Sequence, residues 1–212
     1  MQLTIDGTRL EVTSGTTVLE AIRALGREIP TLCYDPRMAP YGACRVCLVG
    51  AAGAGGPIAA CTTPCREGMV IDTRDETARR VATAIVELVL SELPEPPGEH
   101  SELAAVAGKL GIGALRWPGA VHERRHAPRH PYLALRHELC ISCGRCVRAC
   151  DEIQGAFALT LTGRGFDANV TAGLDSGFRK STCVSCGACA DTCPTEAITE
   201  LALIELAQAI TP

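Results

Sequence analysis

Two near copies of one cysteine run lie in the C-terminal half of the chain. Each has the spacing C-x2-C-x2-C-x3-C, and a proline follows the second copy directly. This spacing is typical of [4Fe–4S] clusters, because three thiolates on one tight loop reach one cube while the fourth cysteine binds another cluster. We therefore expect two crossed ligand sets. The first ligand set is Cys140, Cys143, Cys146 and Cys193, and the second ligand set is Cys150, Cys183, Cys186 and Cys189.

Zinc sites and disulfides are the alternatives for a chain with 13 cysteines. Paired C-x2-C units bind zinc in many proteins, but triple-cysteine runs are poorly suited to a tetrahedral ion. Disulfides belong to oxidising compartments. The spacing therefore predicts iron–sulfur chemistry in a reducing cytoplasm.

A third group of four cysteines lies near the N-terminus, with the spacing C-x10-C-x2-C-x13-C. Plant-type [2Fe–2S] ferredoxins use C-x4-C-x2-C and one distant cysteine, so the order here is the same with a longer first gap. Small residues such as Gly42 and Ala60 would let the backbone pass close to inorganic sulfide. Arg45 either donates near the cluster or is a solvated charge. The predicted ligands of one [2Fe–2S] cluster are Cys33, Cys44, Cys47 and Cys61.

Composition and charge exclude several classes of function. The net charge of −4 gives no reason to expect binding to nucleic acid. The longest mostly apolar run, residues 81–90, contains Glu87 and is too short to cross a membrane. The chain opens with a strand pattern rather than a signal peptide, so we expect a cytoplasmic protein.

The N-terminal residues 1–74 have the order of elements of a β-grasp [2Fe–2S] domain. Residues 2–5 and 10–13 predict a hairpin around the Asp6-Gly7 turn. A helix with helically spaced apolar residues follows, capped by Ser14 or Thr16 and ended by Gly26. Cys65 belongs to no ligand set and is expected to fill a gap in the core. Short strands are expected near residues 45–49, 57–60 and 69–72.

Residues 75–131 are predicted to form a helical linker followed by a basic loop. Helices are expected over residues 75–93 and 101–110, because prolines follow the first and apolar periodicity marks both. In the loop, His122, His126 and His130 are spaced four apart, but Pro128 and Pro131 would break the helix that a metal site requires. The arginines of this loop either contact a partner subunit or are solvated. They are Arg116, Arg124, Arg125 and Arg129.

Residues 132–212 are predicted to form a two-[4Fe–4S] ferredoxin-like domain, which makes the whole chain α+β. An insertion over residues 153–180 separates the two cysteine runs, and a strand is expected there over residues 157–161. A short helix after Pro194 and a helical segment over residues 201–210 are expected to close the chain.

This order of domains resembles the iron–sulfur region of cytoplasmic NAD-dependent formate dehydrogenase alpha subunits. Similar modules occur in the large iron–sulfur subunit of respiratory complex I, the diaphorase small subunit of NAD-reducing [NiFe] hydrogenases, and [FeFe] hydrogenases. The motifs most similar to the formate dehydrogenase branch are PTLC at 30–33, GACRVCL at 42–48, ACTTP at 60–64, CISCGRCVRACDE at 140–152 and GRGF at 163–166.

The chain departs from that family in two places. Many relatives bind another [4Fe–4S] cluster through H-x3-C-x2-C-x5-C, and the aligned positions here are Leu93, Pro97, His100 and Val106. We therefore expect that cluster to be absent. The alpha subunits also continue into a molybdenum- or tungsten-pterin domain, so the resemblance implies a separate subunit, or a cut-down relative, that has lost that catalytic half.

The resemblance implies an electron-transfer subunit with no catalytic site of its own. One [2Fe–2S] and two [4Fe–4S] clusters would pass electrons between a catalytic subunit and a flavin-containing NAD(H) subunit. A formate dehydrogenase partner is favoured, and an NAD-reducing [NiFe] hydrogenase is the alternative. A stand-alone redox sensor or cluster carrier is the alternative from another class.

Overall fold

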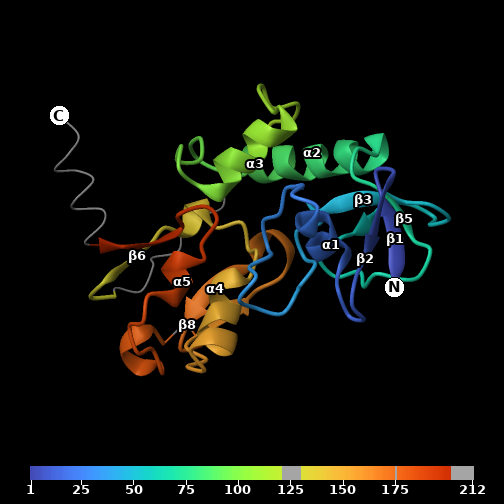
Figure 1. The fold of residues 1–212 in the computed structure, drawn as a ribbon. Helices are drawn as coiled ribbons and strands as arrows, with labels where there is room; N and C mark the ends of the chain where they lie inside the picture. The colour runs from blue at the N-terminus through green and yellow to red at the C-terminus, as the bar shows by residue number, and fades with distance from the viewer. Residues whose placement is uncertain (121–129, 175, 202–212) are drawn as a thin grey trace. The chain divides into compact units, whose positions relative to one another are not determined.

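The computed structural model describes residues 1–120, 130–174 and 176–201 (Figure 1). The chain divides into two compact units. Unit 1 comprises Met1–Tyr34, Pro40–Val89 and Val106–Trp117, and unit 2 comprises Asp35–Ala39, Leu90–Ala105 and Pro118–Pro212. Residues of the expected linker are thus divided between the two units.

Unit 1 is built on a mixed sheet with the strand order β2-β1-β5-β3-β4. Strands β1 and β5 pair in parallel, and the other neighbours pair antiparallel. The Asp6-Gly7 turn joins β1 to β2 with φ of 46° and 81°, as the hairpin prediction requires. The strands are β1 (Gln2–Ile5), β2 (Thr8–Glu11), β3 (Leu48–Ala51), β4 (Ile58–Ala59) and β5 (Val70–Asp72).

Helix α1 (Val18–Ala24) begins at Thr17 rather than at Ser14 or Thr16. The backbone N–H of Thr17 donates to Glu20 Oε2 at 2.7 Å, and the N–H of Glu20 donates to Thr17 Oγ1 at 3.3 Å. This reciprocal capping box satisfies two N–H groups that the first turn leaves free, which explains the start of the helix. Gly26, with φ of 70°, follows the helix as predicted.

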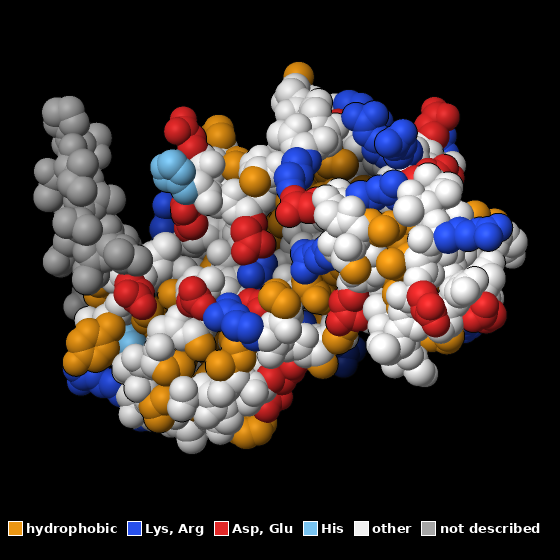
Figure 2. All heavy atoms as spheres, viewed as in Figure 1, with side chains coloured by type: hydrophobic (Ala, Val, Ile, Leu, Met, Phe, Trp, Pro, Cys, Tyr) orange, Lys and Arg blue, Asp and Glu red, His pale blue; other side chains and the backbone are white. Residues whose placement is uncertain are grey.

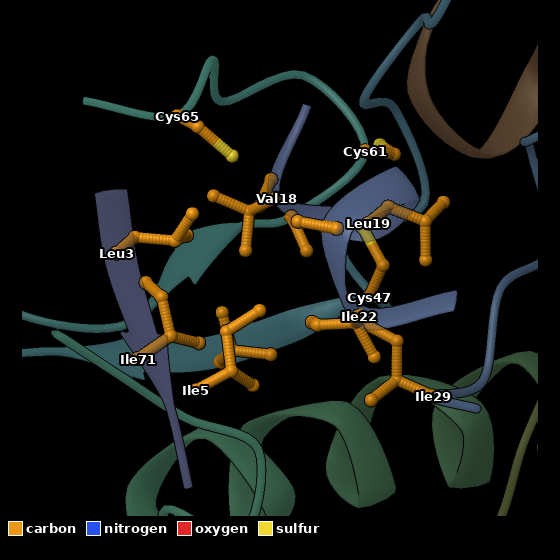
Figure 3. Close-up of a cluster of buried hydrophobic side chains, with 14 residues drawn as sticks. Leu3, Ile5, Val18, Leu19, Ile22, Ile29, Cys47, Cys61, Cys65 and Ile71 are labelled. Carbon is orange, nitrogen blue, oxygen red and sulfur yellow. The ribbon is translucent and has the colours of Figure 1, made fainter. Parts of the chain in front are cut away.

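The core of unit 1 lies between α1 and the sheet. Figure 3 shows the apolar side chains of α1 pointing toward those of β1 and β5. Cys65 is 3% exposed and lies in this core, where a small apolar side chain fits. The fully buried aliphatic residues of the core include Ile5, Val18, Leu19, Ile22 and Val49.

Two longer helices follow the sheet. Helix α2 (Glu76–Ser91) begins where Asp75 Oδ1 accepts the N–H of Ala78 at 2.7 Å, and helix α3 (Glu102–Leu110) begins where Ser101 Oγ accepts the N–H of Ala104 at 3.2 Å. Such caps satisfy N–H groups of the first turn. Both helices lie within the ranges that the sequence predicted. None of the described helices is long and apolar enough to cross a membrane.

From His130 onward, the described residues of unit 2 form two short two-stranded sheets and two one-turn helices. Strand β6 (Leu133–Leu135) pairs with β9 (Ile198–Glu200), and β7 (Leu159–Thr162) pairs with β8 (Asn169–Ala172), both antiparallel. The helices are α4 (Arg145–Arg148), which continues into a π-helical turn over Ala149–Ile153, and α5 (Ala188–Asp191). Short 3-10 turns cover His137–Leu139, Gly165–Asp167 and Phe178–Lys180.

The prediction of a short helix after Pro194 was wrong. Residues 198–200 form strand β9 instead, because their backbone groups pair with β6, and Ala197 O accepts the N–H of Arg136 at 2.7 Å. The expected helical segment over residues 201–210 lies outside the described residues except for Leu201.

On the face drawn in Figure 2, basic and acidic side chains are interspersed, in keeping with the small net charge.

Candidate iron–sulfur cluster sites

The four N-terminal cysteines all belong to unit 1. Cys33 and Cys44 lie on the loop between α1 and β3, Cys47 directly precedes β3, and Cys61 follows β4. The backbone N–H of Cys33 donates to Cys44 Sγ, and that of Cys44 donates to Cys33 Sγ, both at 3.4 Å. Cys44 is half-buried and the other three are buried. Backbone donors aimed at sulfur are what a thiolate-bound cluster requires.

The loop around these cysteines is shaped by unusual backbone conformations. Gly42 has φ of 70°, and a Cβ there would lie 2.9 Å from Thr62 Cγ2, so a larger residue would be strained and would force Thr62 to shift. Arg45 also has a positive φ, 54°, and its side chain is exposed. The loop therefore passes close to its neighbours at Gly42, while the Arg45 side chain is a solvated charge.

The four thiols of this site form two hydrogen-bonded pairs, and each hydrogen bond shifts the pKa of both partners. The pKa of Cys33 is lowered to about 6, first because the Cys44 thiol donates to it and also through backbone N–H groups of the loop. The same hydrogen bond raises the pKa of Cys44. Cys61 and Cys47 form a second such pair, with the pKa of Cys61 lowered and that of Cys47 raised. Bound iron would supply the positive charge that allows all four sulfurs to be thiolates.

A first cavity in unit 2 brings together the first ligand set. Its lining includes apolar side chains from β6, β8 and β9, such as Leu135, Val170 and Ile198. His137 and Thr195 also line it. The cysteines of this cavity are Cys140, Cys143, Cys146 and Cys193.

A second cavity in unit 2 brings together the second ligand set. Its apolar lining includes Leu133, Leu159 and Phe178. The cysteines of this cavity are Cys150, Cys183, Cys186 and Cys189. Each cavity therefore combines three cysteines of one run with the fourth cysteine of the other.

The two binding loops, residues 140–146 and 183–189, have matching backbone geometry. Ser142 and Ser185 have φ of 51° and 58°, and Gly144 and Gly187 have φ of 75° and 78°. In the first loop the N–H of Ser142 donates to Cys140 Sγ at 3.4 Å, and in the second the N–H of Ser185 donates to Cys183 Sγ at 3.4 Å. The left-handed residues turn the backbone so that amide hydrogens face sulfur.

The fourth cysteine of each run sits in a different setting. Cys150 lies in the π-helical turn, and its Sγ accepts the N–H of Ala158 at 3.2 Å. Cys193 follows α5, and its Sγ lies 3.7 Å from Thr195 Oγ1. The proline after Cys193 has no N–H and cannot continue a helix, and α5 ends before it, at Asp191.

Burial makes these cavities poor places for unpaired thiolates. Burial raises the pKa of Cys143 and of Cys189 to about 12, and it raises the pKa of Cys146 as well. Iron would supply the positive charge that a buried thiolate lacks. Within the described residues no three His, Cys, Asp or Glu side chains are arranged to hold a single metal ion. Four sulfurs around a cavity suit a cluster of several irons.

A buried charge network in unit 2 was not predicted from the sequence. Arg145, 4% exposed, donates from Nε to Thr192 Oγ1 at 2.9 Å and from its two terminal nitrogens to Glu102 at 2.6 and 2.9 Å. Thr192 in turn donates to Asp35 Oδ2 at 2.8 Å. An arginine within a ligand run, between Cys143 and Cys146, was the only sequence signal.

His130 is a second residue whose role was missed. It is 8% exposed, and its ring packs edge-on against Phe178 with centroids 4.7 Å apart. Burial lowers its pKa, which favours the neutral imidazole. His122 and His126, its partners in the four-residue spacing, lie outside the described residues. The exposed His100 is the one histidine among the four positions aligned with the expected missing cluster.

Two domain families match the chain. A 2Fe-2S iron-sulfur cluster binding domain matches residues 1–76, and a 4Fe-4S dicluster domain matches residues 139–197. The N-terminal and C-terminal parts are therefore iron–sulfur domains of the two kinds that the cysteine spacing predicted.

Curated relatives of this chain are subunits of oxidoreductases. A subunit of the NADH-quinone oxidoreductase of Rhizobium meliloti is 35% identical over 81% of this chain and 21% of its own length. The alpha subunit of the NADPH-Fe(3+) oxidoreductase of Geobacter sulfurreducens is 37% identical over 78% of this chain and 20% of its own length. The chain thus spans about a fifth of the length of these curated relatives.

A solved structure matches over most of both chains. It is the crystal structure of an NAD+-reducing [NiFe]-hydrogenase in the H2-reduced state, with a TM-score of 0.86 and 33% identity. The match covers 95% of this chain and 87% of that chain. The chain therefore belongs to the family of iron–sulfur proteins that includes this hydrogenase chain and the matching part of the NADH-quinone oxidoreductase relative.

Proposed function

We propose that this protein is an electron-transfer subunit of a multi-subunit NAD(P)-linked oxidoreductase of the cytoplasm. Its clusters pass single electrons between a catalytic subunit and a flavin-containing NAD(H) subunit. The observation that carries the proposal is the gathering of two complete cysteine sets around two apolar cavities of unit 2. Apolar walls and backbone donors are the means by which a protein sets cluster potentials.

The proposed cofactors are one [2Fe–2S] cluster and two [4Fe–4S] clusters. The [2Fe–2S] cluster is held in unit 1 by the four N-terminal cysteines, and the two cubanes are held by the first and second ligand sets. We propose no cluster at the positions aligned with the histidine and three cysteines of some relatives, because three of those four positions hold leucine, proline and valine.

Two catalytic partners are supported by different observations. The likeness to a chain of NAD+-reducing [NiFe]-hydrogenase over 87% of that chain supports a hydrogenase partner. The sequence motifs around Cys44 and Cys146 support a molybdenum or tungsten formate dehydrogenase. Metal analysis of the native complex decides between them, since nickel accompanies the first and molybdenum or tungsten the second.

The experiment is anaerobic purification of the native complex, followed by iron analysis and EPR at graded potentials. We expect about ten irons in this chain, from two [4Fe–4S] clusters and one [2Fe–2S] cluster. NADH should reduce these clusters when the flavin subunit is present and not when it is removed.

Three outcomes would contradict the proposal. About fourteen irons would show a further cubane. Zinc in place of iron would remove the electron-transfer role. A stable monomer that co-purifies with no other subunit would favour a stand-alone sensor or cluster carrier.

A further inference from the structure

His130 contacts a cysteine of the second ligand set from outside the cysteine runs. Its Nε2 lies 3.6 Å from Cys183 Sγ and 3.4 Å from Ser185 Oγ. On the other side of the ring, Nδ1 accepts the backbone N–H of Tyr132 and that of Leu133, both at 3.1 Å. The imidazole therefore bridges the start of β6 and the second binding loop.

These contacts determine where the ring carries its proton. A nitrogen that accepts two backbone N–H groups uses its lone pair and cannot also hold a hydrogen. In the neutral ring the proton must then lie on Nε2, which becomes a donor. Among the described residues, the acceptors within reach of this donor are Cys183 Sγ and the Ser185 hydroxyl.

We propose that His130 is a positioning residue that tunes the redox potential of the [4Fe–4S] cluster at Cys183 by donating Nε2–H to that sulfur. This inference rests on the proposed cluster of the second ligand set. A reduced cluster carries one more negative charge than an oxidised cluster, so a donor to sulfur stabilises the reduced form and raises the potential. Burial strengthens the effect because little water screens it.

The first ligand set lacks this contact among the described residues. Cys140 Sγ accepts the N–H of Ser142, as Cys183 Sγ accepts that of Ser185, but the histidine that lines the first cavity is engaged elsewhere. The Nδ1 of His137 lies 2.6 Å from Asn169 Oδ1. The imidazole donor therefore distinguishes the second cluster from the first.

The test is the variant His130→Asn in the intact complex. An asparagine side-chain oxygen can accept the N–H groups of the turn as Nδ1 does, but it has no donor that reaches Cys183. We expect the reduction equilibrium of the second cluster to fall about tenfold, which is a shift of about 59 mV to lower potential for one electron. The potential of the first cluster should stay unchanged in the same EPR titration.

His100→Asn is the matched control, because it makes the same chemical change at an exposed histidine of unit 2. It should shift neither potential. Ser185→Ala removes the competing acceptor and should leave the second potential unchanged or slightly higher. An unchanged second potential in His130→Asn, or equal shifts of both clusters, would overturn the inference.

A second measurement on the unmodified protein covers the case in which His130→Asn loses its cluster. With histidine labelled with 15N at Nε2, pulsed EPR of the reduced second cluster should show a nitrogen coupling and an exchangeable proton. The absence of both would overturn the inference even if the variant cannot be studied. Failure of the proposed function would look different, since the EPR signals of two cubanes would then be missing from the unmodified protein.

Discussion

The two cysteine loops of unit 2 have the same backbone conformation, but different side chains surround them. Both turn through a left-handed serine and a left-handed glycine, and both aim the serine N–H at the first sulfur. In the first loop, position 145 is an arginine buried in a charge network, and the matching position 188 in the second loop is alanine. The second loop instead receives the imidazole of His130.

This difference separates two requirements of a cluster site. The shared turns supply the geometry that three thiolates on one loop need, and that geometry tolerates little change. The unshared neighbours supply charge and hydrogen bonds, which set stability and potential. Cys186 is exposed, while the four cysteines of the first ligand set are buried or half-buried, so the second site is also the more open to solvent.

The largest effect is expected from replacing the fourth cysteine of either run, Cys150 or Cys193, with alanine. If the ligand sets are crossed, Cys150→Ala removes the cluster of the second loop and Cys193→Ala removes that of the first. The EPR spectrum of Cys150→Ala should then match that of Cys183→Ala, and the spectrum of Cys193→Ala should match that of Cys140→Ala. Each variant should lose about four of about ten irons.

Cys65→Ala is the control for these two replacements, because Cys65 lies in the core of unit 1 and outside the ligand sets. It should keep all its iron. Matching spectra for Cys150→Ala and Cys140→Ala would instead mean that each run binds its own cluster.

A smaller effect is expected from the buried arginine of the first loop. Arg145→Ala leaves Asp35, 3% exposed, without one of its positive neighbours and leaves Thr192 without its donor. Asp35 keeps its ion pair with Arg37 at 2.7 Å, so we expect a loss of about 2 kcal/mol from the hydrogen bonds of Arg145, which lowers the melting temperature by roughly 4–8 °C for a chain of this size. Anaerobic calorimetry of the cluster-loaded protein measures the shift.

Arg179→Ala provides the comparison for that experiment, because Arg179 is an exposed arginine of the same unit. Its effect should stay within about 0.5 kcal/mol. If both arginine variants melt at the temperature of the unmodified protein, the network contributes no stability and the first loop needs no ionic support.

Sequence reasoning reached the cysteine groups because ligand spacing is a local property of the chain. The helices over α2 and α3 were also predictable, since their apolar periodicity extends over several turns. The three-residue strands β6 and β9 were not, because so short a strand is defined by a partner more than sixty residues away.

Sequence reasoning missed the contacts of His130 and Arg145 for a related reason. His130 meets Cys183 across 53 positions, and Arg145 meets Glu102 across 43. Spacing within a motif says nothing about such contacts. The N-cap of α1 shows the limit on a smaller scale, because three hydroxyl residues compete for the cap and only the pairing with Glu20 selects Thr17.

The smallest effect is expected where the two loops are alike. Gly144→Ala and Gly187→Ala each place a Cβ on a left-handed residue, with φ of 75° and 78°, at a cost of about 1 kcal/mol. At Gly187 the new Cβ would also lie 2.8 Å from Glu200 Oε1, the far end of a side chain that can move aside. Both variants should therefore lower the melting temperature by roughly 2–4 °C.

Gly108→Ala is the opposite case, because Gly108 lies within α3 and a Cβ there meets nothing within 4 Å. That variant should gain about 0.5–1 kcal/mol from the higher helix propensity of alanine. A loss at only one of Gly144 and Gly187 would show that the loops differ in backbone as well as in surroundings. Equal losses at both, with a gain at Gly108, would mean that only the neighbours of the two clusters distinguish them.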